Sequence, residues 1–330
     1  MSEGTLLRMT APLREDFAIP YHDLGPGGEP PRVALVAGLH GDEANGVFVL
    51  GRLASFLRRL EGEGTAGRGL RRRVLIVPAV NVLGLNTHSR VWPFDRTDLN
   101  RMFPGYAAGE TTQRIARAVL DLTRAAHYRV DIHSSNLTFE EVPQVRLYEP
   151  TPDERATALL FGFPAVLERP ANPVYSTTIG CAWRAYGGES FVVQVGQAGS
   201  LQTHHCDHLF RALVRFLVAT ETLAGFDLAT EEGDIHCFGV RQTLPVVSKH
   251  AGMFVSPLEV GSWLQAGDVV GQIYDGFEGE LITEVRTPMG GLLSGVRRQP
   301  LLLEGDLVAR VQTRQQLSEG LDIGLLGHAQ

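Results

Sequence analysis

The feature that most constrains the fold is a regular alternation between two hydrophobic patterns. Continuous apolar runs such as VALVAGL are typical of strands that are buried on both faces of a sheet. Between them lie segments with apolar residues at helical spacing. This alternation predicts an α/β fold with a mostly parallel mixed sheet flanked by helices. The expected strands are residues 33–39, 74–80, 128–133 and 190–196, and the expected helices are residues 44–60, 111–126, 153–163 and 207–225.

The pattern changes after about residue 233. Short β-like runs with glycine and proline turns follow, and none of them has a helical period. We therefore predict an α/β domain over residues 1–233 and a small all-β domain over residues 234–330, which ends in a tail from residue 317. The stretch LQAGDVVGQI resembles the strand units of lipoyl-like barrels. Because no lysine stands at a carrier turn, a structural barrel is the preferred interpretation.

Composition excludes several classes of protein. The 330 residues carry a formal net charge of −7, which gives no indication of nucleic-acid binding. No apolar run approaches the roughly 18 residues of a membrane span, and the N-terminus lacks the pattern of a signal peptide. The cysteines, Cys181, Cys206 and Cys237, are widely spaced, which fits free thiols in a reducing compartment. We expect a cytoplasmic protein without nucleic-acid or membrane partners, and leave homo-oligomerisation open.

Two candidate metal ligands follow the first predicted strand. In GLHGDEANG, His40 and Glu43 are three residues apart at a helix start, so both side chains can reach one ion. His133 closes a second buried strand in DIHSS, and parallel strand ends meet at one edge of a sheet. An HxxE pair alone is more often a surface turn, but two histidines and a carboxylate are typical of catalytic zinc. Asp131 either orients a histidine ligand or packs inside the sheet.

The segment 81–105 is too long and too polar for a strand. It carries Arg90, Arg96, Asn100 and Arg101. Arginine binds carboxylates in a bidentate fork, so this cluster near a metal indicates a small anionic substrate. The alternative is a set of ion pairs between the loop and the core. We prefer that alternative for Arg96, which lies close to Asp95 and Asp98.

Three motifs in this order, GLHGDEANG, DLNRMFPG and DIH, resemble the succinylglutamate desuccinylase/aspartoacylase family. This family is a branch of the zinc carboxypeptidase-like fold, and the resemblance covers about residues 30–225. It implies that this chain, like members of the family, hydrolyses the amide bond in an N-acyl amino acid. The implied roles are one Zn²⁺ per chain on His40, Glu43 and His133, polarisation of the scissile carbonyl by Arg90, and binding of the substrate carboxylate by Asn100 and Arg101. The sequence does not distinguish zinc from another divalent ion.

One position departs from the family pattern. The family carries its general base as a glutamate two residues before a glycine, and the matching residue in ESFVVQVGQAG is Gln194. Glutamine cannot accept a proton, and loss of a positioned acid/base costs on the order of 10²–10⁴-fold in rate. Another carboxylate could serve, a substrate with an easier leaving group could be used, or the protein could bind zinc and a ligand without turnover. The candidate carboxylates are Glu140, Glu141 and Glu189.

The preferred function is a zinc-dependent amidohydrolase that deacylates a small N-acyl amino acid or a related carboxylate-bearing amide. The first alternative is a zinc-binding ligand sensor or pseudoenzyme, and the second is a metallocarboxypeptidase. Strand alternation places Gln194 on the same face as Val192, where its amide could orient water or substrate if that face meets the metal. The cluster of residues 203–207, THHCD, also contains metal-ligand types. We assign it to helix capping by Thr203 or Asp207.

Overall fold

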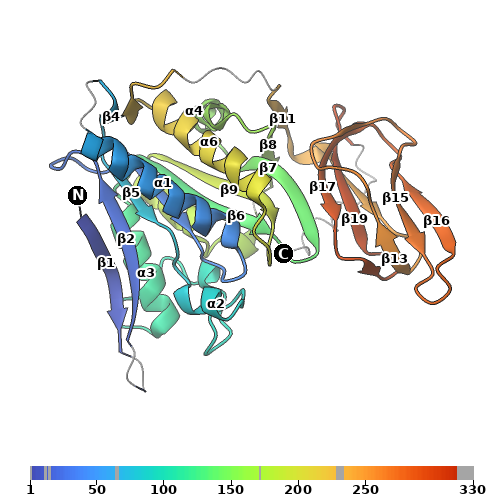
Figure 1. Cartoon of the computed structure of the whole chain (residues 1–330), viewed down its shortest axis with the longest axis horizontal. Coiled ribbons are helices and arrows are strands. Elements are labelled where there is room, and N and C mark those ends of the chain that lie inside the picture. The colour runs from blue at the N-terminus through green and yellow to red at the C-terminus, as the bar shows by residue number, and fades with distance from the viewer. Residues whose placement is uncertain are drawn as a thin grey trace.

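The computed structural model describes residues 2–10, 13, 16–63, 67–170, 172–227 and 234–317. A large mixed sheet forms its centre, with helices on both faces (Figure 1). Four neighbouring parallel strands make the middle of this sheet, which confirms the predicted fold class. In sheet order they are β5 (Val74–Val77), β3 (Val33–Ala37), β6 (Tyr128–Ser135) and β9 (Glu189–Gln197). Their apolar runs are continuous because side chains are buried on both faces.

The two sides of the central strands carry elements that the sequence pattern did not predict. On one side, β1 (Ser2–Met9) and β2 (Phe17–Leu24) form an antiparallel hairpin, and β2 pairs with β5. On the other side, β7 (Phe139–Tyr148) runs antiparallel to β9. Two further strands extend from β7 in parallel, and they are β8 (Ala165–Arg169) and β11 (His236–Phe238).

Each face of the sheet packs against its own helices. One face is covered by α1 (Ala44–Glu63) and α6 (Thr203–Ala219), which lie side by side and contact each other through Phe56 and Phe210, with ring centroids 5.6 Å apart (Figure 1). The opposite face is covered by α3 (Thr111–Thr123) and α5 (Ile179–Trp183). The remaining short helices are α2 (Val82–Asn86) and α4 (Pro152–Ala158).

The predicted side-chain capping of α6, the helix expected at residues 207–225, is wrong. The helix begins at Thr203, four residues before the predicted start, and its N-cap is Gln202. No side chain caps this end through a hydrogen bond. Asp207 instead lies inside the helix, where its Oδ1 accepts a hydrogen bond from Arg52 Nη1 at 2.7 Å.

The C-terminal strands continue the central sheet. The strand β17 (Gly291–Arg297) pairs antiparallel with β7. The two strands approach each other closely at Gly295, where a Cβ would lie 2.5 Å from Phe139 Cε1. Next come β19 (Leu307–Gln312) and β12 (Thr243–Val247). A separate antiparallel sheet contains β16 (Leu281–Arg286), β15 (Val269–Tyr274), β13 (Gly252–Val255) and β18 (Leu301–Leu302). The short strands are β4 (Gly69–Leu70), β10 (Leu223–Ala224) and β14 (Trp263–Leu264).

Several predictions concern residues at the limits of the described chain. The domain boundary at residue 233 falls at the end of segment 228–233, outside the described residues, and it stays a prediction. The predicted tail begins at residue 317, and all of it beyond that residue lies outside them as well. The three cysteines are free thiols, as expected. Within the described ranges, no helix combines the length and apolar character that a membrane span needs.

Candidate metal centre

The three predicted ligands, His40, Glu43 and His133, converge at the carboxyl ends of neighbouring strands. His40 follows β3, Glu43 directly precedes α1, and His133 lies near the end of β6. Because β3 and β6 are adjacent and parallel, their ends meet at one edge of the sheet. All three side chains are buried, and their donor atoms lie within 4.8 Å of one another. The chain therefore builds one compact donor set from residues far apart in sequence.

Glycines in the first motif make this loop geometry accessible. Gly38 has a φ of +64°, a left-handed conformation that non-glycine residues rarely adopt. A Cβ on Gly41 would lie 2.1 Å from the carbonyl carbon of Gly84, so only glycine permits the loop to pack against the segment after Asn81. These two constraints fix the path of the chain on either side of His40.

Each imidazole is held from both sides. The Nδ1 atoms of His40 and His133 lie 2.7 and 2.9 Å from the two carboxylate oxygens of Glu43. The opposite Nε2 atoms lie 3.1 Å from Asp98 Oδ1 and 2.7 Å from Asp131 Oδ2, respectively. A carboxylate that accepts the Nε2 proton leaves the Nδ1 lone pair available to a cation. Of the two alternatives for Asp131, the structure shows the one in which it orients a histidine.

The electrostatics of the set favour a positive charge at its centre. Burial opposes ionisation of Glu43, but the two imidazoles outweigh it and hold the Glu43 pKa well below its usual range. Burial also lowers the pKa of His133, yet the charges of Asp131 and Glu43 raise this pKa to about 10. The His40 pKa is raised in the same way, since Glu43 and Asp98 outweigh burial. This donor set fits a divalent metal ion, which displaces the protons when it binds.

Asp98 is a site residue that the sequence interpretation missed. It was considered only as a partner of Arg96, but in the described chain Arg96 forms no ion pair with Asp95 or Asp98. Instead, Asp98 bonds to His40, and its Oδ2 lies 3.9 Å from Arg90 Nη2. Its position two residues before Asn100, in a motif already assigned to the site, was the available signal.

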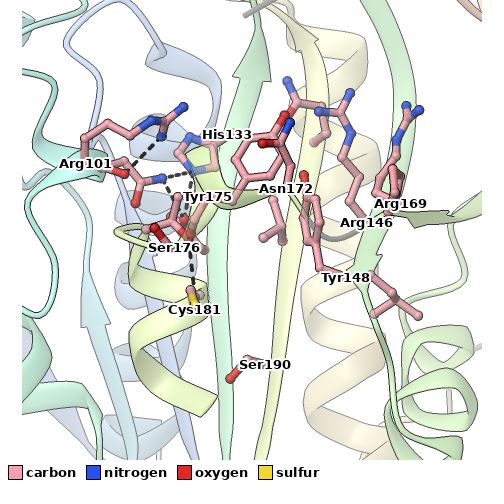
Figure 2. A pocket seen from close by; sticks show the side chains of 18 of the residues that line it. Arg101, His133, Arg146, Tyr148, Arg169, Asn172, Tyr175, Ser176, Cys181 and Ser190 are labelled. Atoms are coloured by element: carbon pink, nitrogen blue, oxygen red, sulfur yellow. Dashed lines mark hydrogen bonds and ion pairs between the residues drawn. The ribbon is translucent and has the colours of Figure 1, made fainter. Parts of the chain in front are cut away.

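A cavity of about 740 Å³ opens from the metal ligands, and the predicted substrate residues line it. Arg90 Nη1 donates to Glu43 Oε1 at 3.2 Å. Arg101 lies over the Tyr175 ring, 5.7 Å from its centroid, on the same side of the cavity as His133 (Figure 2). Asn100 is bound within the protein, because its Oδ1 accepts from Ile179 N at 3.0 Å. The roles of these three residues toward a substrate stay predictions.

The position of the missing base also lines the cavity. Gln194 is buried and stands in register with His133 on the neighbouring strand. Glu189 lies at the opposite end of β9, with its Oε1 3.5 Å from His127 Nε2. Glu141 does line the cavity, but its two oxygens bind the guanidinium groups of Arg310 and Arg146. Neither of these two carboxylates is free to act beside the metal ligands.

The third candidate, Glu140, belongs to a separate group. Its Oε1 lies 2.8 Å from His205 Nε2, and its Oε2 accepts from Arg298 Nε at 2.5 Å. Burial raises its pKa, but these two bonds outweigh burial and lower the pKa to about 2. Together with the exposed His204, Glu140 and His205 form a second group whose side-chain atoms are of the types that ligate metals. Because the guanidinium group of Arg298 already matches the carboxylate charge, we assign no metal to this set.

The sheet order, the two helix layers and the candidate ligand set at the strand ends define a mixed α/β protein with a candidate metal site at one edge of its central sheet. Residues 29–219 match the succinylglutamate desuccinylase/aspartoacylase catalytic domain, and the chain belongs to this family.

Individual relatives agree with that assignment. The chain is 27% identical over 296 residues to an N-alpha-acetyl-L-2,4-diaminobutyric acid deacetylase from Halomonas elongata, covering 86% of this chain and 82% of that protein. A succinylglutamate desuccinylase/aspartoacylase structure from Rhodobacter sphaeroides has a TM-score of 0.75 and 22% identity, with 94% and 95% of the two chains covered. The product-bound ectoine utilization protein from Ruegeria pomeroyi has a TM-score of 0.74 and 23% identity, with the same coverage. The deacetylase relative supports a hydrolase that acts on amides.

Proposed function

We propose that this protein is a zinc-dependent amidohydrolase that removes the acyl group from a small N-acyl amino acid. The observation that carries the proposal is the buried set of two imidazole Nδ1 atoms around one carboxylate, at the end of a cavity lined by arginines. The deacetylase relative supports the reaction class. His40, Glu43 and His133 are the residues that would hold zinc.

The surrounding residues have separable roles in this proposal. Bound zinc supplies a Lewis acid that activates water toward an amide carbonyl. Asp98 and Asp131 keep the two imidazoles in the tautomer that presents Nδ1. Arg90, whose Nη1 lies 3.2 Å from Glu43, is placed to donate to the carbonyl oxygen as negative charge develops on it. Arg101 supplies a guanidinium that can bind the substrate carboxylate in a bidentate fork.

The direct test combines metal analysis with hydrolysis of a panel of N-acyl amino acids by the purified chain. We expect one equivalent of zinc per chain and release of the free amine from at least one substrate. Removal of zinc by a chelator should stop the release, and added zinc should restore it. Zinc without turnover on any substrate would favour a ligand sensor, and absence of metal would overturn the proposal.

The substitution Gln194→Glu tests the second candidate function, a metal-binding ligand sensor without turnover. We expect kcat/KM for N-acyl amino acids to rise on the order of 10²–10⁴-fold, because a carboxylate can take the proton from water and return it to the leaving amine. Steady-state kinetics of amine release measure the change. Turnover that exists only in the variant would identify the natural protein as a ligand sensor.

A matched control separates this effect from added charge alone. Gln299→Glu places the same charge outside the cavity, at a side chain whose Oε1 accepts from Arg297 Nη2 at 3.1 Å. This control should leave kcat/KM unchanged. If Gln194→Glu instead abolishes turnover, the amide of Gln194 itself positions water or substrate, and the expected gain is refuted.

A further inference from the structure

We infer that Asn45 is a positioning residue, whose buried side-chain amide holds the candidate metal ligand Glu43 in place. This inference rests on the proposed function and goes beyond it, because Asn45 is not one of the three candidate ligands and does not line the cavity. Asn45 stands in the first turn of α1, two residues after Glu43, and its side chain is fully buried. A buried primary amide needs partners for both its donors and its acceptor, so those partners indicate its role.

The link between Asn45 and Glu43 passes through Ser134. Asn45 Nδ2 donates to Ser134 Oγ at 3.3 Å, and both side chains are buried. The backbone amide of Ser134 donates in turn to Glu43 Oε2 at 3.0 Å. The same carboxylate oxygen lies 2.9 Å from His133 Nδ1. Asn45 therefore holds the end of β6 that carries both a candidate ligand and the amide that orients the Glu43 carboxylate.

The amide of Asn45 also holds the end of β9. Its Nδ2 lies 3.4 Å from the carbonyl oxygen of Val195 and 3.5 Å from that of Gln197. Gly196 stands between these two residues with a φ of +66°, and a Cβ there would lie 3.1 Å from Asn45 Nδ2. The backbone at this glycine thus approaches the amide closely. Because β6 and β9 both contribute to the candidate site, one side chain ties both strand ends to the start of α1.

A second amide, that of Gln202, supports Asn45 from the outside. Gln202 N donates to Asn45 Oδ1 at 2.9 Å, which leaves the Nδ2 end of the Asn45 amide to face the two strands. The side chain of Gln202 donates through Nε2 to Glu140 Oε1 at 3.0 Å. Glu140 is bound on its other oxygen by Arg298 Nε, at 2.5 Å. Hydrogen bonds thus connect the C-terminal part of the chain to the Glu43 carboxylate through Asn45.

This arrangement matters for a metal ion because the ion requires its ligand atoms in one geometry. Groups that orient ligands without touching the ion commonly contribute about 10- to 100-fold to metal affinity. Without the Asn45 amide, Ser134 would lose a partner and both strand ends would gain freedom. Binding of an ion would then have to order them, which weakens it. A purely structural role for Asn45 would lower stability but would not change metal affinity specifically.

The zinc affinity of Asn45→Ala tests the inference. We expect its zinc dissociation constant, measured by competition with a chromophoric chelator, to rise about 10- to 100-fold over that of the natural protein. Gln312→Ala is the matched control, because Gln312 is equally buried and its Nε2 donates to Ser294 Oγ at 2.9 Å in the C-terminal part of the chain. This control loses a comparable buried amide and should keep the zinc affinity of the natural protein. An equal rise in the two variants would overturn the inference.

Ser134→Ala is the second variant, and it decides the question if Asn45→Ala does not fold. It removes the hydroxyl that accepts from Asn45 but keeps the backbone donor to Glu43. We expect zinc affinity to fall here as well, and by less than in Asn45→Ala, because the bonds from Asn45 to the end of β9 remain. Unchanged zinc affinity in these variants would refute a positioning role.

Hydrogen exchange in the metal-free protein separates failure of this inference from failure of the proposed function. In Asn45→Ala, or in Ser134→Ala if the former does not fold, we expect the backbone amide of residue 134 to exchange faster. The amide of Ile76, a buried residue of β5, should change less. A general loss of stability would accelerate both amides equally, and that result would overturn the inference. Absence of zinc binding by the natural protein would count only against the proposed function.

Discussion

Replacing His133 with alanine is expected to remove the bound metal and to lower kcat/KM by about 1000-fold or more. The imidazole is one of the three proposed donors, and the loss of several kcal/mol of transition-state stabilisation corresponds to that factor. The remaining residues, His40 and Glu43, would leave the ion with an incomplete set of protein ligands. Metal content by mass spectrometry and amine release should therefore fall together.

Two histidine controls make this result specific. His127→Ala changes a half-exposed side chain at the opposite end of β6, and His204→Ala changes the exposed member of the set around Glu140. Both variants should keep one equivalent of metal and full turnover. A loss of metal in His204→Ala would relocate the ion to the second set, and an unchanged metal content in His133→Ala would contradict the assigned centre.

The substitution Glu141→Ala is expected to destabilise the fold by about 3–5 kcal/mol, because it removes one partner of a buried ion-pair network. Arg146 and Arg310 would remain in the protein interior without the carboxylate that binds both. Arg169 adds further repulsion, since its positive charge acts on both Arg146 and Arg310. Urea unfolding, monitored by circular dichroism, gives the change in the free energy of unfolding.

An exposed ion pair provides the comparison. Glu168→Ala breaks the pair in which Arg155 Nε lies 2.6 Å from Glu168 Oε1, and the Arg155 side chain is 48% exposed. Water replaces that interaction, so we expect a loss of about 1 kcal/mol or less. Equal losses in the two variants would show that the network around Glu141 is hydrated, and they would contradict the expected cost of a buried ion pair.

The sequence predicted the strands whose burial on both faces produces a continuous apolar run in their own residues. Strand β3 reads as a continuous apolar run because both its faces are covered, and its prediction holds. Strand β7, FEEVPQVRLY, was missed although it is almost entirely buried. Its charged residues are matched by Arg298 and Arg310, more than 150 positions further along the chain. A pattern of apolar residues cannot reveal a strand whose burial depends on such distant partners.

The candidate site was also predicted only in part. His40, Glu43 and His133 were found because parallel strand ends share an edge and because their motifs resemble a family. Asp98 was missed as a partner of His40, since the two residues stand 58 positions apart in the sequence. Its role depends on a contact with the His40 ring that only the three-dimensional structure reveals.

The pairing of β17 with β7 has a consequence for the order in which the molecule assembles. The contact between Glu141 and Arg310 spans 169 residues, whereas the metal ligands all lie between residues 40 and 133. Closing a longer loop costs more entropy, so we expect the ligand set to form early in folding and the contact between Glu141 and Arg310 to form late. A molecule in which the last strands have detached would keep His40, Glu43 and His133 together but would lose Arg310 from the wall of the cavity. The wall of the cavity is thus completed by the part of the chain that folds last.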